Sequence, residues 1–212
     1  MSALDLEEQE QLASLKAWWN QYGNMVTLAA TLALLAVAAW YGWNGYRQSR
    51  SQEAAALYET LQKASRANDV KAARDAAGTI LEKYSSTVYG PLAALVSAKL
   101  HFQSGDLKTA KAQLAWVTEN SSNEELKSVA RLRLANVQLD ESTPDEALKT
   151  LSAKPGAGFE ALFEATRGDV LLVQKKVADA RAAYKSALDK AGKADPGLAE
   201  QLRRKLEALG EG

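Results

Sequence analysis

The longest apolar stretch of the chain lies near its N-terminus. No charged residue occurs between Ala17 and Tyr46, and residues 25–40 consist mainly of Ala, Leu and Val. A helix that crosses a membrane needs about 20 mainly apolar residues at about 1.5 Å each. We therefore predict a transmembrane helix over residues 24–46, preceded by a short tail of residues 1–23.

Aromatic and basic side chains flank this apolar stretch on both sides. Indole and phenol rings favour the headgroup layer of a bilayer, and the long basic side chains can reach the phosphates. A buried core helix would not need aromatic side chains at both of its ends. The pattern therefore favours a lipid bilayer as the surroundings of this segment. The flanking residues are Lys16, Trp18, Trp19 and Tyr22 on one side, and Trp40, Tyr41, Trp43, Tyr46, Arg47 and Arg50 on the other.

A cleaved signal peptide is the alternative interpretation of the same stretch. Residues 36–38 (AVA) resemble a cleavage site, but the preceding region is long and contains Asp5, Glu7, Glu8 and Glu10. A secretory signal begins with a short basic region, so an uncleaved anchor fits better.

The charges beside the predicted span do not settle its orientation. The N-terminal flank has Lys16, whereas the C-terminal flank has Arg47, Arg50, Lys63 and Arg66. This count favours a cytoplasmic C-terminal domain, but long domains translocate largely regardless of charge. The orientation stays open at this point.

Residues 47–212 show short apolar helical patterns separated by turn signals, without the alternation typical of strands. Asp106, Asn123 and Thr143 are expected to cap the helices that follow them. Such a pattern predicts an all-α array of helical hairpins. The interruptions lie at 68–69, 89–91, 105–106, 121–123, 142–144, 155–156, 175–176 and 195–197.

An internal repeat runs through this region. The motif Ala-x3-Leu/Tyr occurs at residues 110–114, 147–151 and 180–184, at spacings of 37 and 33 residues. Twelve residues before each motif stands a small residue, Ala98, Ala135 or Gly168. These spacings match the tetratricopeptide template, in which small residues let two antiparallel helices touch. We predict a tetratricopeptide-like α-hairpin solenoid in which Gly168 lies where two helices approach closely, with a final capping helix around Leu202.

Composition and charge narrow the possible functions. The chain holds 26 basic and 26 acidic residues, so it lacks the positive charge that nucleic-acid binding requires. It has no cysteine, and His101 is its only histidine, so thiolate and multi-histidine metal sites are excluded. The carboxylate pairs at 124–125 and 145–146 fit helix starts better than acid–base catalysis. We predict no catalytic residue, no cofactor and no metal.

The remaining candidate site is a groove on the concave side of the solenoid. It would be apolar with one polar residue per repeat, which suits an apolar polypeptide. The alternative is that its leucines only pack between helices. The concave positions are Leu92, Leu95, Lys99 and Phe102, then Val129, Leu132, Asn136 and Leu139, then Leu162, Ala165, Asp169 and Leu172. The candidate protein-binding residues among them are Leu95, Lys99, Phe102, Leu132, Asn136, Leu139, Asp169 and Leu172.

Several segments in one order resemble a known family, the YfgM-like ancillary subunits of the SecYEG translocon of Gram-negative bacteria. They are residues 15–23 (LKAWWNQYG), 41–44 (YGWN), 89–95 (YGPLAAL), 125–135 (ELKSVARLRLA), 146–151 (EALKTL) and 167–172 (RGDVLL). The resemblance implies an inner-membrane protein with a cytoplasmic tail and a periplasmic tetratricopeptide-like domain. It also implies that the chain associates with the SecYEG translocon, with the membrane-anchored periplasmic chaperone PpiD and with exported polypeptides.

These observations together predict a non-enzymatic, membrane-anchored adaptor of the translocon. On orientation we follow the resemblance rather than the charge count. The alternatives are a helical-repeat scaffold that faces the cytoplasm, a cell-envelope assembly scaffold and, less well supported, a membrane-anchored enzyme.

Overall fold

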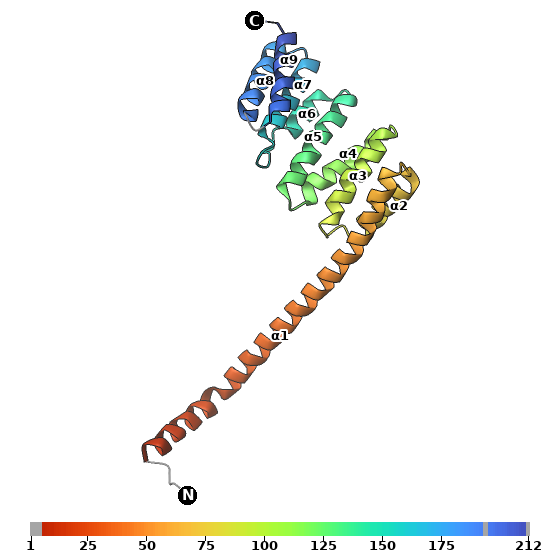
Figure 1. The fold of residues 1–212 in the computed structure, drawn as a ribbon. Helices are drawn as coiled ribbons and strands as arrows, with labels where there is room; N and C mark the ends of the chain where they lie inside the picture. Colours follow the sequence, from red (N-terminus) through yellow and green to blue (C-terminus); the bar gives the residue numbers. More distant parts are fainter. Residues whose placement is uncertain (1–5, 193–194, 211–212) are drawn as a thin grey trace. The chain divides into compact units, whose positions relative to one another are not determined.

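The computed structural model describes residues 6–192 and 195–210, and every regular element among them is a helix (Figure 1). The all-α prediction is therefore confirmed. The chain divides into two compact units, and the boundary between them along the sequence lies between Arg50 and Ser51. The helices are α1 (Leu6–Arg66), α2 (Val70–Lys83), α3 (Tyr89–Gln103), α4 (Leu107–Asn120), α5 (Glu124–Asp140), α6 (Pro144–Thr150), α7 (Glu160–Val173), α8 (Val177–Ala191) and α9 (Pro196–Ala208).

The first unit contains the part of α1 up to Arg50. Among the described residues, α1 is the one helix that is long and apolar enough to cross a membrane, and none of its most apolar window is buried. Trp18, Trp19, Trp40 and Trp43 are all exposed. A long helix that exposes apolar side chains along its length needs an apolar environment to cover them.

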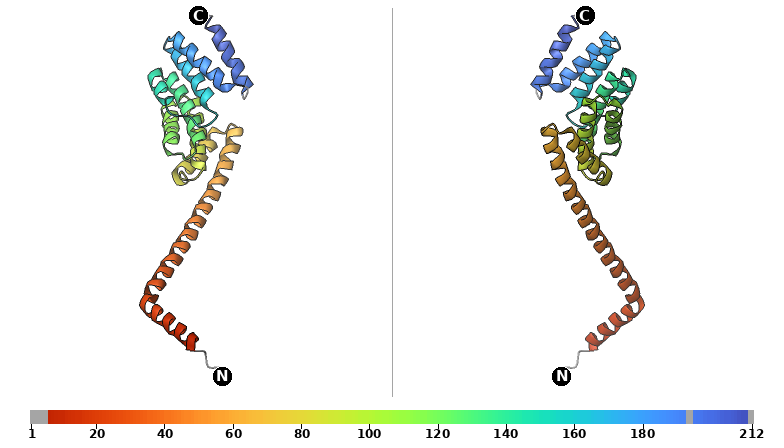
Figure 2. Two further views of the ribbon diagram at one scale, coloured as in Figure 1. Left: turned by 90° about the vertical axis from the view of Figure 1, so that its left-hand side faces the viewer. Right: turned by 90° about the vertical axis from the view of Figure 1, so that its right-hand side faces the viewer.

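The second unit begins with residues 51–66 of α1 and continues as a series of antiparallel hairpins (Figure 2). Helices α3 and α4, α5 and α6, and α7 and α8 pair within hairpins, and α9 packs on α8. The first helices of successive hairpins also touch, α3 with α5 and α5 with α7. This succession of neighbour contacts is the arrangement expected for a helical solenoid.

Each hairpin is held by a small residue on one helix and a larger residue on the other. Helices approach closely only where a side chain on one of them is small, and the partner then fills the space that remains. Residues 51–66 of α1 also pack against α2, and in this pair the order is reversed, with the larger residue on the first helix. The pairs, all of them buried, are Leu61 with Ala77, Ala98 with Leu114, Ala135 with Leu151, and Gly168 with Tyr184.

The turns within the hairpins share one backbone conformation. Asn68, Gly105, Ser142 and Lys175 all have positive φ, between 56° and 81°. They are 37, 37 and 33 residues apart, so the turn repeats with the same period as the helices. Only glycine adopts this conformation without steric cost, and Ser and Lys do so here because the hairpin geometry requires it.

Two of the three predicted helix caps are confirmed. The side chain of Asp106 accepts a hydrogen bond from the Thr109 N–H, and that of Asn123 accepts one from the Leu126 N–H. The prediction for Thr143 was wrong, although this residue does precede α6. Its hydroxyl instead donates to the carbonyl of Gln138, at 2.9 Å, and so closes the end of α5 rather than the start of α6.

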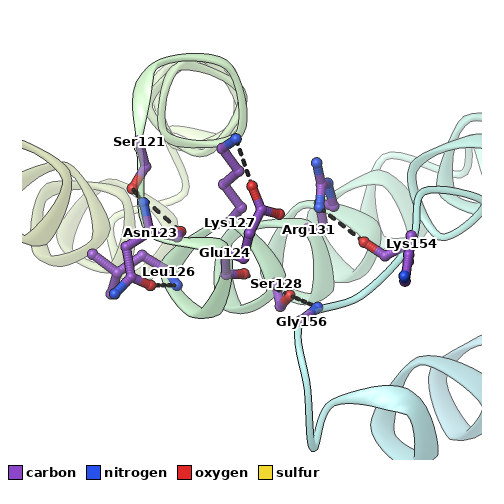
Figure 3. Close-up of polar contacts among 9 residues, drawn as sticks. All are labelled: Ser121, Asn123, Glu124, Leu126, Lys127, Ser128, Arg131, Lys154 and Gly156. Carbon is purple, nitrogen blue, oxygen red and sulfur yellow. Dashed lines mark hydrogen bonds and ion pairs between the residues drawn. The ribbon is translucent and has the colours of Figure 1, made fainter.

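The loop between α6 and α7 runs back along α5 (Figure 3). The Gly156 N–H donates to Oγ of the buried Ser128, at 2.8 Å, and that hydroxyl donates to the Glu124 carbonyl. Arg131 reaches the carbonyl of Lys154. A Cβ at position 156 would lie 3.1 Å from the Glu124 carbonyl oxygen, so glycine allows this close approach. These bonds hold the loop against α5, where α6 is only seven residues long.

Candidate protein-binding groove

A cavity of about 370 Å³ opens between α3 and α5. Three of the predicted groove residues, Lys99, Phe102 and Asn136, line it. The structure therefore brings together residues that are far apart in the sequence. The full lining consists of Ala98, Lys99 and Phe102 from α3, Leu114 from α4, and Arg133, Asn136 and Val137 from α5.

Helical spacing explains why these side chains meet. Lys99 and Phe102 are three residues apart on α3, and Arg133 and Asn136 are three apart on α5, so each pair shares a helix face. The packing of Ala98 against Leu114 leaves space beside α3 because alanine is small.

The cavity has an apolar floor and a polar rim. Ala98, Leu114 and Val137 are almost fully buried and supply the floor. Phe102, by contrast, is 40% exposed. Neither Lys99 nor Arg133 forms an ion pair with another described residue, although an Arg133 Nη donates to the carbonyl of Leu95, at 3.3 Å. The rim therefore carries positive charge above an apolar surface.

The leucines among the candidate residues lie deeper than the rim. Leu95 is only 6% exposed and belongs to the cluster around Leu134. Leu132 and Leu139 are half-buried and pack against the cluster that contains Phe163. These side chains support the helices, so the accessible part of the candidate groove is formed by Lys99, Phe102 and Asn136.

On α7 the corresponding positions make contacts within the chain. The Tyr184 hydroxyl donates to Asp169, at 2.6 Å, and Lys205 of α9 contacts the same carboxylate. Lys205 Nζ also lies 5.3 Å from the centroid of the Tyr184 ring. Leu172 packs on the cluster that includes Leu202 of α9. The capping helix therefore engages both candidate residues of α7.

Burial and a neighbouring carboxylate affect the Tyr184 phenol. Burial raises its pKa well above the ordinary value, and the hydrogen bond and negative charge of Asp169 raise the pKa further. The phenol stays neutral and keeps donating to Asp169 over the whole range of physiological pH.

The single histidine belongs to a turn. His101 Nδ1 lies 2.9 Å from the carboxylate of Asp106, the residue that caps α4. Hydrogen bonds from Thr109 hold the pKa of Asp106 below its usual range. Within the described part of the chain, no group of three or more His, Cys, Asp or Glu side chains is arranged to hold a metal ion.

Comparison with known families agrees with this architecture. The model for the tetratricopeptide repeat-like domain matches residues 16–211. The chain belongs to this family. The cavity accordingly lies between the first helices of two neighbouring tetratricopeptide-like repeats.

Curated relatives cover nearly the whole chain. A protein named ancillary SecYEG translocon subunit from Escherichia coli K12 is 29% identical over 95% of this chain and 96% of its own length. A protein of the same name from Neisseria gonorrhoeae is 29% identical over 98% of this chain and 99% of its own. A third, from Haemophilus influenzae, is 27% identical over 95% of this chain and 97% of its own. The resemblance noted from the sequence is confirmed.

Sequence reasoning missed Arg133 as a lining residue of the tetratricopeptide-like groove. A signal for it was present, because Arg131 and Arg133 are the two charged residues in the otherwise apolar centre of α5. Arg133 also lies three residues before Asn136, hence on the same helix face.

Proposed function

We propose that the chain is a membrane-anchored, non-enzymatic adaptor of the SecYEG translocon. Residues 24–46 span the inner membrane, the N-terminal tail is cytoplasmic and the repeat domain is periplasmic. One observation carries this proposal: an exposed apolar helix precedes a tetratricopeptide-like unit, in a chain that matches ancillary translocon subunits over both parts.

The two parts have separate tasks in this proposal. The anchor supplies location, and the repeat domain contacts exported polypeptides and a PpiD-like membrane-anchored chaperone. Tethering raises the effective concentration of the repeat domain beside an emerging chain, so weak binding suffices. A domain with near-equal numbers of acidic and basic residues suits contacts of this kind.

The resemblance to the YfgM-like family implies the periplasmic orientation, whereas the charges beside the span favour the opposite one. A cytoplasm-facing scaffold is therefore the second candidate function. The observation in its favour is the basic C-terminal flank, which includes Arg47 and Arg50.

Single cysteines can decide between the two orientations, because the chain has no cysteine of its own. Ser122 and Ser152 are exposed in the repeat domain, and Ser14 is exposed on α1 before the predicted span. In intact spheroplasts, a membrane-impermeant maleimide is expected to label Ser122→Cys and Ser152→Cys but not Ser14→Cys. The reverse pattern would support the cytoplasmic scaffold.

Association with the translocon needs its own test. We expect the full-length protein, extracted in mild detergent, to copurify with SecYEG. A fragment of residues 51–212 is expected to keep its helical circular dichroism but to lose most of this association if the span supplies the contact. Absence of copurification for the full-length protein would contradict the proposed function.

A further inference from the structure

We propose that the cavity between α3 and α5 binds a polypeptide segment in which an acidic side chain lies next to a large apolar one. This inference rests on the proposed function only in that the repeat domain binds polypeptides. It specifies which residues of this chain do so and which chemistry they recognise.

The cavity has the size and floor for an apolar side chain. Its volume of about 370 Å³ lies within the range of about 300–1,000 Å³ found for ligand pockets. Ala98, Leu114 and Val137 form an apolar floor, and Phe102 presents part of its ring at the edge. An apolar side chain that enters would remove the exposed part of Phe102 from water, which favours binding.

The rim has the charge for a carboxylate. Lys99 and Arg133 come from neighbouring helices and line one opening, and neither forms an ion pair with a described residue. The side chain of Asn136 adds an amide group, and this group makes no hydrogen bond with the residues described. Two cations and an amide donor offer one carboxylate several charge-assisted hydrogen bonds.

The next repeat shows the same kind of pairing already made within the chain. Asp169 on α7 occupies the position that Lys99 has on α3 and Asn136 on α5, by the repeat spacing. There the carboxylate of Asp169 is met by Lys205 of α9. The charged group on this face of α7 is therefore paired within the chain. The cations on α3 and α5 are not, and a bound partner could pair with them.

A peptide titration tests the inference on the full-length protein in nanodiscs of phosphatidylcholine, whose neutral headgroups do not compete for the cations. The probe is a short labelled peptide with both ends blocked, in which Phe-Glu is flanked by Gly and Ser, and binding is followed by fluorescence anisotropy. We expect replacement of Glu by Gln in the peptide to weaken binding by about three- to tenfold. Replacement of its Phe by Ala is expected to weaken binding as well.

Variants of the protein locate the site. Lys99→Gln/Arg133→Gln is expected to weaken binding of the Phe-Glu peptide by a similar factor. Its affinity for the Phe-Gln peptide is expected to equal that of the wild type. Binding to the wild type is expected to weaken as salt is raised, and binding to this double variant is not. Lys108→Gln/Lys149→Gln, which removes two exposed cations elsewhere, is the matched control and is expected to bind like the wild type. Phe102→Ala is expected to weaken the binding of both peptides.

Several results would overturn the inference. They are equal affinity for the Glu and Gln peptides, no effect of Lys99→Gln/Arg133→Gln, and equal binding by a peptide whose only carboxylate is its free C-terminus. Copurification with SecYEG, measured for the same variants, separates the two proposals. If the peptide results fail while copurification persists, the cavity assignment is wrong and the adaptor function stands.

Discussion

The ring of Tyr184 on α8 occupies the space that any side chain at Gly168 on α7 would need. A Cβ at position 168 would lie 2.4 Å from Cε1 and 2.6 Å from Cδ1 of this ring. Tyr184 is fully buried and its hydroxyl donates to Asp169, so moving the ring aside would disturb its neighbours and this hydrogen bond. The close approach predicted for Gly168 from the repeat is thereby confirmed, together with the residue that causes it.

Gly168→Ala is therefore expected to destabilise the repeat domain. Alanine is the better helix former by about 1 kcal/mol, but the clash with Tyr184 should outweigh this and lower the free energy of unfolding by about 1–3 kcal/mol. Urea denaturation of the 51–212 fragment, followed by circular dichroism, measures the change. Gly78→Ala is the control, because Gly78 of α2 is exposed with no atom near its Cβ position, and we expect it to stabilise by about 0.5–1 kcal/mol.

A second substitution can test the cause of this effect. The double variant Gly168→Ala/Tyr184→Leu copies the small and large pair found at Ala98 and Leu114. We expect its loss of stability to be smaller than the sum of the two single losses, because leucine leaves room for the added methyl group. Strict additivity would show that the two side chains do not compete for the same space.

The raised pKa of the Tyr184 phenol predicts a loss of stability at alkaline pH. In the unfolded chain a tyrosine ionises near pH 10. Because the folded state holds the proton to higher pH, the unfolded state binds fewer protons above about pH 10, and the free energy of unfolding falls as pH rises. We expect Tyr184→Phe to be less stable at neutral pH by about 0.5–1.5 kcal/mol but to show a shallower alkaline decline. Equal slopes for the two proteins would contradict this assignment.

The sequence was sufficient for the helical repeat but not for its turns. Spacing alone located the small and large residues of three hairpins, because that packing depends on residue size and helical period. It did not show that Ser142 and Lys175 adopt positive φ, or that Thr143 donates to α5. Those features depend on how two helices meet, and neither residue type favours the observed conformation by itself.

The candidate groove was accessible to sequence reasoning only in part. Leu95 and Phe102 both fit the concave register, yet the first is buried and the second is exposed. Which side chain is covered depends on the neighbouring helix α5, and a periodic pattern on α3 contains no information on it. Arg133 was missed although its charge stands out in the apolar centre of α5, because only the packing of α5 on α3 shows that it lies on the cavity rim.

The repeated turn conformation predicts opposite effects at two equivalent positions. Gly105→Ala places a Cβ on a residue with φ of 81°, and with no atom nearby its cost is that of the backbone alone, about 1 kcal/mol. Lys175→Gly removes the same cost at φ of 63° and is expected to stabilise by about 0.5–1 kcal/mol. Thermal unfolding of the 51–212 fragment measures both changes. A lower melting temperature for Lys175→Gly would show that the lysine side chain contributes more than its backbone costs.

The difference in burial between Leu95 and Phe102 allows a test of which side chain belongs to the core and which lines the groove. Leu95→Ala removes a core side chain, so we expect it to lower the free energy of unfolding by about 2–5 kcal/mol. Phe102→Ala removes a partly exposed ring at the cavity edge and is expected to cost less than about 1 kcal/mol. Denaturation of both variants under the same conditions gives the comparison.

In a binding experiment we expect the opposite order, with a larger direct effect of Phe102→Ala than of Leu95→Ala. A photoreactive amino acid at the exposed Gln103, next to Phe102, reports what occupies the cavity edge in cells that export protein. We expect Phe102→Ala to lower the yield of crosslinks to polypeptides at unchanged stability, because the ring supplies apolar surface to the partner. Leu95→Ala should lower the yield only as far as it unfolds the domain, which helicity measured on the same variant will show. If Phe102→Ala instead keeps full crosslinking, or if Gln103 captures no polypeptide in the wild type, the edge of this cavity does not bind polypeptides and the repeat domain must contact them elsewhere.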